Sequence, residues 1–169
     1  MDQEVLFGKV LDAYRAYYNV KTEDVEAPFD AEAVFAGKQE QYFLMHSAKL
    51  AEVQSNEYVY LAKRPVLREE ELLSLCEAAW ERGTAQVRPN SNHKSSDVTL
   101  LLLVPELSEE VRRAASKVKY SKTYKLGLWG FSNFRVAVIE SASGEAAFNG
   151  QGKLLKPLVS EIYHTEGGK

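Results

Sequence analysis

The feature that most constrains the fold is the apolar run Val98–Val104, which is followed directly by Pro105. Seven residues suit a strand and are short for a helix. The run shows no alternation of polar and apolar residues, so we expect both faces of the strand to be covered. Pro105 ends the strand because proline removes a backbone donor. A second apolar run, Phe134–Ile139, predicts another strand further along the chain.

Between these two runs the sequence predicts an amphipathic helix that begins after Ser108. Ser108 is a favourable N-cap, and the acidic residues Glu109 and Glu110 suit the first turn. The apolar stripe of the helix consists of Val111, Ala114, Ala115 and Val118. A crossover helix of this kind gives a right-handed parallel return. The long connection after the helix leaves an antiparallel return open.

The remaining pattern completes a domain of the α/β class, with α+β as the alternative. We expect a mixed sheet of about five strands with helices on both faces. Residues 1–169 are expected to form one globular domain with a frayed tail at 164–169. Gly83 is expected to follow a helix as its C′ residue. The predicted helices are Asp2–Asn19, Arg68–Arg82 and Leu154–Tyr163; the strands are Phe29–Phe35, Glu40–Met45, Tyr58–Leu61 and Ala146–Asn149; the loops are Arg88–Ser96 and Gly150–Lys153.

Composition excludes several classes of protein. The chain has 45% hydrophobic and 27% charged residues, which is ordinary for a globular protein and argues against disorder. No apolar run is long enough to cross a bilayer, and the acidic start of the chain does not suit a secretory signal, so no membrane partner is expected. Cys76 is the only cysteine, so no internal disulfide can form. Its apolar helical neighbours predict a buried, inert thiol, and the cytoplasm is the expected compartment.

Several short motifs stand out: Tyr42-Phe43-Leu44, Asn56-Glu57-Tyr58-Val59-Tyr60, His93, Gly130-Phe131-Ser132-Asn133-Phe134-Arg135, and Asn149 with Gly152-Lys153. Together they resemble an uncharacterised family of small bacterial proteins, chiefly from Firmicutes. The resemblance spans roughly residues 29–155. This chain departs from the family pattern at Lys94–Asp97, where an aromatic residue and a threonine are expected after His93. The resemblance implies no established activity and no catalytic residue.

The sequence carries no signature of a common cofactor or metal site, so no cofactor is expected. A phosphate-binding loop requires a glycine where Ala147 stands and a hydroxyl where Leu154 stands. No glycine fingerprint for a dinucleotide is present. His46, His93 and His164 are far apart in the sequence and do not form a paired ligand motif.

The leading functional hypothesis is therefore a non-enzymatic binding or protein-interaction domain. The alternative is a metal-dependent, nuclease-like enzyme that cleaves phosphodiesters. Such chemistry needs two or three acids and a lysine around a metal ion. The available groups are Asp30, Glu32, Glu52, Glu57 and Lys63. Alternating charges on half-exposed strands account for the same residues.

The predicted central helix and its connection carry a basic run, and no acid lies between Val111 and Tyr124. Basic patches attract phosphates and aromatic rings can stack on bases, so this run is a candidate nucleic-acid surface. The solvated face of a sheet-covering helix explains the same charges. A protein partner or a second copy of the chain is a further candidate. The basic residues proposed for nucleic acid are Arg112, Arg113, Lys117 and Lys119, with Tyr120, Tyr124 and Trp129 nearby.

Two predictions concern individual polar residues. A ligand site, if one exists, is expected around His93, Lys94, Arg135 and Lys153, because polar loops on a rigid sheet carry most binding residues. Arg135 lies alone among apolar residues and needs a partner. With the two best strands parallel and adjacent, we expect Asp97 or another acid at that end, such as Glu57, to neutralise it.

Overall fold

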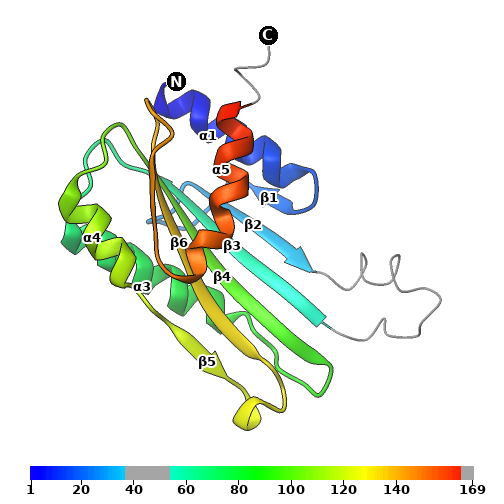
Figure 1. Cartoon of the computed structure of the whole chain (residues 1–169). Helices are drawn as coiled ribbons and strands as arrows, with labels where there is room; N and C mark the ends of the chain where they lie inside the picture. The colour runs from blue at the N-terminus through cyan, green and yellow to red at the C-terminus, as the bar shows by residue number, and fades with distance from the viewer. Residues whose placement is uncertain (37–53, 165–169) are drawn as a thin grey trace.

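The computed structural model describes residues 1–36 and 54–164, and its central element is a mixed seven-stranded sheet (Figure 1). The spatial order is β1-β2-β3-β4-β6-β5, and β7 also pairs with β6. The fold class and the mixed sheet are confirmed, and the sheet is slightly larger than the five strands expected. The strands are β1 (Asn19–Lys21), β2 (Ala31–Ala36), β3 (Gln54–Lys63), β4 (His93–Val104), β5 (Ser121–Thr123), β6 (Phe131–Glu140) and β7 (Ala146–Phe148).

The centre of the sheet is parallel. β4 pairs in parallel with β3 on one side and with β6 on the other, with Val98 opposite Phe134. The helices α3 (Glu69–Ala85) and α4 (Glu109–Lys117) connect these three strands. The parallel return that the sequence left open is therefore confirmed. β4 is buried from Ser96 to Val104, as the unbroken apolar run predicts.

The flanking strands are antiparallel. β1 pairs with β2 and β2 with β3, while β5 and β7 pair with the first and second halves of β6 along the same edge. Neither β1 nor β5 was predicted. Each has only three residues, which is too short to show a period. The predicted strand Glu40–Met45 lies outside the described residues.

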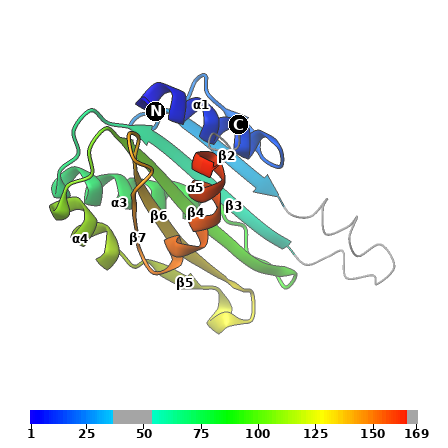
Figure 2. The same cartoon turned by 45° about the horizontal axis from the view of Figure 1, so that its top comes forward.

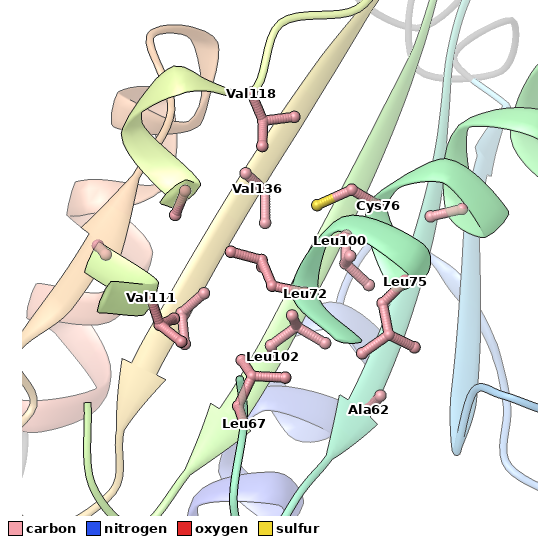
Figure 3. Packing of buried hydrophobic residues seen from close by; sticks show 14 of the residues in the cluster. Ala62, Leu67, Leu72, Leu75, Cys76, Leu100, Leu102, Val111, Val118 and Val136 are labelled. Carbon is pink, nitrogen blue, oxygen red and sulfur yellow. The ribbon is translucent and has the colours of Figure 1, made fainter. Parts of the chain in front are cut away.

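One face of the sheet is covered by α3 and α4. Leu72 and Cys76 of α3, and Val111 of α4, pack on Leu100, Leu102 and Val136 of the sheet (Figure 3). These side chains are almost fully buried, and a buried aliphatic side chain contributes roughly 1.5–3 kcal/mol. Burial raises the pKa of the Cys76 thiol to about 12, which agrees with an inert thiol.

The opposite face is covered by α1 (Gln3–Arg15) and α5 (Lys156–His164), so helices cover both faces as expected (Figures 1 and 2). Leu6 and Val10 of α1, and Ile162 of α5, share a second core with Leu101 and Leu103 of β4. Successive residues of β4 thus enter different cores. The 3₁₀ turn η2 (Gln151–Leu155) precedes α5 at the position of the predicted loop Gly150–Lys153.

Capping residues fix where the helices begin. The side chain of Ser108 accepts a hydrogen bond from the Val111 N–H, which confirms it as the N-cap of α4. Asp2 caps α1 in the same way through the Val5 N–H. Gly83 does not end a helix, so its prediction as a C′ residue was wrong. It lies inside α3, and a Cβ there would stand 2.5 Å from Cγ2 of Val98. Close packing of helix on strand, not turn geometry, explains this glycine.

Among residues 1–36 and 54–164, no helix combines the length and apolar character needed to cross a membrane.

Candidate functional site

A charged cluster lies on the α1 and α5 face of the sheet, towards the starts of the parallel strands. The guanidinium of Arg135 lies 2.9 Å from the Asp97 carboxylate and 3.7 Å from that of Glu57. The Glu57 carboxylate also accepts hydrogen bonds from the hydroxyls of Thr99 and Tyr18. The predicted neutralisation of Arg135 by Asp97 and Glu57 is therefore confirmed. The pairing follows from the register, which sets Asp97 opposite Glu57 and Thr99 opposite Arg135.

Burial dominates the electrostatics of this cluster. The side chains of Asp97 and Glu57 are only 12% exposed. Burial raises the pKa of the Asp97 carboxyl, although the Arg135 guanidinium and the Asn133 N–H oppose that shift. The Nε atom of Arg135 is buried and has no acceptor among the described residues. These contacts link the three strands to one another. They also engage the carboxylates of both Asp97 and Glu57, so neither is free to bind a ligand.

A second polar region lies at the other face, where His93 holds a hairpin. Nδ1 of His93 lies 2.6 Å from the carbonyl oxygen of Trp129, and Nε2 lies 2.6 Å from Oγ of Ser96. The carbonyl can only accept, so Nδ1 carries the proton. The ring of His93 is also nearly perpendicular to that of Tyr124 at a centroid distance of 5.5 Å, and the Tyr124 hydroxyl lies 2.9 Å from Oγ of Ser132. The imidazole is thus committed to holding the connection between β5 and β6 against the start of β4.

That connection contains the 3₁₀ turn η1 (Lys125–Gly127) and forms the tip of a hairpin at the end of the sheet opposite to α1 (Figures 1 and 2). Leu126 is fully exposed, Leu128 is 80% exposed and Phe131 is 39% exposed. Exposed apolar clusters on monomers usually mark an interaction surface. We call residues Tyr124–Phe131 the hairpin tip.

Basic side chains follow the chain from α4 to the hairpin tip. Arg113, Lys117 and Lys119 are exposed and have no ion pair within the described ranges 1–36 and 54–164. Lys125 lies with its Nζ 4.1 Å from the centroid of the Trp129 ring. Arg112 is instead engaged by Glu109 and Glu145. Of the four residues proposed for nucleic acid, three are therefore available and Arg112 is not. We call Arg113, Lys117, Lys119, Lys122, Lys125 and Lys94 the basic strip.

Two pockets flank the middle of this strip. Each has a volume of about 330 Å³, and both include the segment Lys117–Tyr120 in their walls. One lies between that segment and Gln151, and the other lies against Leu73 of α3. The ring of Tyr120, which lines both pockets, stacks on Trp80 at a centroid distance of 5.7 Å.

The comparisons with known proteins identify a family. A family model described as "Domain of unknown function (DUF8052)" matches residues 2–161. The chain belongs to this family. The resemblance to an uncharacterised family is thus confirmed, while its expected bacterial source stays a prediction. Neither the curated proteins nor the solved structures contain a match to this chain.

The four ligand-site residues predicted from the sequence lie in different parts of the DUF8052 domain. Arg135 lies in the charged cluster. His93 contacts Ser96, which points to the opposite face from Asp97 because neighbouring strand residues alternate. Lys94 is exposed beside the hairpin tip, and Lys153 is exposed in η2. Their role in binding a ligand stays a prediction, and only His93 and Lys94 adjoin a common surface.

The acids that the sequence offered for phosphodiester chemistry do not converge among the described residues of this DUF8052 domain. Glu32 lies 3.9 Å from Arg82 of α3, whereas Glu57 contacts Tyr18 on the other face of the sheet. Asp30 accepts a hydrogen bond from the Lys63 N–H. Glu52 lies outside the described residues. No group of three or more metal-ligating side chains occurs in the part of the chain that the structure describes.

Sequence reasoning missed the exposed apolar residues of the hairpin tip. The stretch Leu126-Gly127-Leu128-Trp129-Gly130-Phe131 follows neither a helical nor a strand period, and its glycines indicate only a break in regular structure. The available signal was the density of large apolar side chains within a turn. Turns normally carry small and polar residues, so such density favours an exposed functional surface.

Proposed function

We propose that this DUF8052 domain is a non-enzymatic binding module whose ligand is a polyanionic surface. One observation carries the proposal: no Asp or Glu occurs in residues 88–96 or 111–139, and these two segments meet at the hairpin tip. The chain as a whole has a net charge of -3, so this absence of acids is local. A local positive field of this kind attracts anionic partners even when the whole protein is acidic.

The contacts within the basic strip support the same proposal. Three of its cations, Arg113, Lys117 and Lys119, are not used to stabilise the described fold through ion pairs. Lysines that extend into solvent gain little for stability, and no acid lies in the same segment of the chain, which favours an external anion as their partner. The neighbouring helix α3 does bring acids near, since Glu69 lines the same pocket as Lys117 and Lys119. The pockets on both sides of Lys117–Tyr120 add concave surface next to these charges.

Nucleic acid is one polyanion of the expected kind, and an anionic lipid surface is another. The cytoplasm is the compartment expected from the sequence, and both are present there. The phosphodiesterase alternative has no supporting observation among the described residues, because Glu32 and Glu57 lie on opposite faces of the sheet.

Binding to heparin tests the proposal. The full chain is expected to bind heparin at low salt and to elute by about 0.5 M salt, because binding to a polyanion releases counterions. The variant Lys117→Gln/Lys119→Gln should reduce the slope of log affinity against log salt by roughly two. The matched control is Lys21→Gln/Lys156→Gln, which removes the same charge from elsewhere and should leave the slope unchanged. Equal slopes for both double variants would reject the basic strip as the binding surface.

A further inference from the structure

The hairpin tip combines two properties that a purely electrostatic surface does not need. Its aliphatic side chains Leu126 and Leu128 are exposed to solvent, Lys122 and Lys125 precede them in the chain, and the backbone of Lys94 lies against Gly130 of the same tip. Burying an exposed leucine is favourable, so leaving two of them at the end of a projecting turn costs solubility without contributing to the core. The arrangement therefore favours a partner with an apolar interior and an anionic surface.

Most backbone N–H groups of the tip form hydrogen bonds within the turn. The N–H groups of Gly127, Leu128, Trp129 and Gly130 all donate hydrogen bonds within the turn, to carbonyl oxygens 3.0–3.3 Å away. Unsatisfied backbone groups are the main cost of placing a turn in an apolar medium. With four consecutive donors satisfied internally, the second half of this turn has few backbone N–H groups left to desolvate, whereas those of Lys125 and Leu126 have no partner among the described residues.

The tip is also held in one position. The carbonyl oxygen of Trp129 is bound by His93, and Gly130 packs so closely on the carbonyl of Lys94 that a Cβ would lie 2.3 Å from it. Lys125 and Leu126 adopt positive φ values of 48° and 54°, which non-glycine residues rarely do. Such backbone strain is found mostly where a conformation serves a function. The leucines are thus presented by a fixed scaffold.

We propose that the hairpin tip docks on an anionic lipid bilayer, with Leu126 and Leu128 entering the acyl boundary and the basic strip facing the headgroups. Trp129 and Phe131 then lie at the interface, where aromatic residues are favoured. Lys94, Lys122 and Lys125 gain electrostatic attraction to the anionic leaflet. The proposal rests on the proposed function and names its ligand. The chain needs no membrane-crossing segment for this, since only a turn enters the interface.

The same observations favour lipid over nucleic acid. Aliphatic side chains gain nothing from bases, which are recognised by stacking and hydrogen bonds. The one tryptophan of the tip carries the Lys125 ammonium close to its ring and is only partly exposed, so it does not offer a free stacking platform. Nucleic acid is therefore an outcome of the test and not the proposal.

The test is sedimentation of the full chain with phosphatidylcholine vesicles that contain or lack phosphatidylserine. Binding is expected only with phosphatidylserine present. The variant Leu126→Gln/Leu128→Gln should lower the partition coefficient by at least about tenfold, because both side chains lose apolar burial even if the acyl boundary covers them only in part. The matched control is Val66→Gln/Leu154→Gln, which changes two exposed aliphatic residues away from the tip and should bind like the wild type.

Fluorescence reports insertion directly. The chain has two tryptophans, so Trp80→Phe leaves Trp129 as the only one. Its emission should shift to shorter wavelength on phosphatidylserine vesicles and be quenched by brominated acyl chains. Circular dichroism of each variant checks that the fold is intact, and exposed side chains at the leucine positions make unfolding of those variants unexpected.

The outcomes separate this inference from the proposed function. Binding to heparin and single-stranded DNA without binding to vesicles overturns the lipid proposal and leaves the polyanion surface in place. Vesicle binding that Leu126→Gln/Leu128→Gln does not weaken overturns insertion of the tip. Failure to bind heparin, DNA and vesicles overturns both. Loss of vesicle binding in the tip variant, with heparin binding retained, supports the lipid proposal.

Discussion

Asp97 and Arg135 lie on a sheet face that becomes fully apolar a few residues further along the same strands. Leu101 and Ala137 follow them towards α1 and α5, and both are completely buried. The charges are tolerated because they pair with each other and with Glu57 at the margin of the core. A buried charge with a partner costs far less than one without, although the pair itself adds little net stability. The cluster joins β3, β4 and β6 at one level, so we expect it to act mainly on strand register.

The raised pKa of Asp97 sets the sign with which this residue makes the free energy of unfolding depend on pH. The folded protein holds this proton more tightly than the unfolded chain, whose aspartate titrates at about 3.9. The stability that wild type has relative to Asp97→Asn should therefore increase as pH falls through the interval between the raised value and about 3.9. It should decrease as pH rises through the same interval. Urea unfolding of both proteins across this range measures the difference. The opposite slope would show that attraction to Arg135 outweighs the burial of Asp97.

Gly130 offers a second test at a single residue. Its φ of +85° and its contact with the Lys94 carbonyl both exclude a side chain. Gly130→Ala should lower the free energy of unfolding by more than about 2 kcal/mol. Gly127→Ala is the matched control, because Gly127 also has a positive φ but a Cβ added there would meet no atom within 4 Å. That control should cost only about 1 kcal/mol. Equal losses would mean that the tip is not packed on the start of β4.

At the scale of elements, the sequence predicted the helices and strands that have a long periodic or unbroken apolar pattern. The helix after Ser108 follows from capping and begins where expected, at Glu109. The strand of Val98–Val104 follows from an unbroken apolar run and ends where expected, but β4 begins already at His93, inside the predicted loop Arg88–Ser96. β1 and β5 were missed because three residues carry no period, and their pairing depends on neighbours supplied by β2 and β6. The hairpin tip was missed for a related reason: exposure is a property of the surroundings, which a local pattern does not contain. Gly83 was misread because close packing and helix termination use the same residue type.

The helical glycines Gly8 in α1 and Gly83 in α3 test whether close packing explains a glycine inside a helix. Gly8→Ala should raise the free energy of unfolding by roughly 0.5–1 kcal/mol, because no neighbour lies within 4 Å and alanine is the better helix former. Gly83→Ala should lower it by roughly 1–3 kcal/mol, because the new methyl group meets Val98. Thermal and urea unfolding measure both. Combining Gly83→Ala with Val98→Ala should cost less than the sum of the two single losses, which is the sign of a direct contact. The same sign of change for Gly8→Ala and Gly83→Ala would contradict this account.

At the scale of the whole molecule, the sheet separates two cores that share its central strand. The core under α3 and α4 contains Leu102, and the core under α1 and α5 contains Leu101. Because one strand serves both, the two helical layers are not independent. The charged cluster and the hairpin tip both lie at the margins of these cores. Residues of the sheet hold each of them in place: β3, β4 and β6 carry the cluster, and the start of β4 holds the tip.

Leu101→Asp and Leu102→Asp should both prevent folding. Each places a carboxylate without a partner in a fully buried position, at a cost of several kcal/mol compared with a total domain stability of roughly 5–15 kcal/mol. Leu154→Asp is a suitable control, because that leucine is 62% exposed. Circular dichroism and the melting temperature report the result. Cooperative unfolding that persists in only one of the two core variants would show that one helical layer folds without the other.

The lateral edges of the sheet have a consequence for assembly. Among the described residues, one edge is formed by β1 and the other by β5 and β7, and each of these strands has three residues. Lysines stand in two of them, Lys21 in β1 and Lys122 in β5. Short, charged edge strands offer no continuous row of free backbone groups to a strand from another molecule, which protects a sheet protein from fibre formation. Strand addition at these described edges is therefore disfavoured, which favours side-chain surfaces for any higher-order complex of the folded domain.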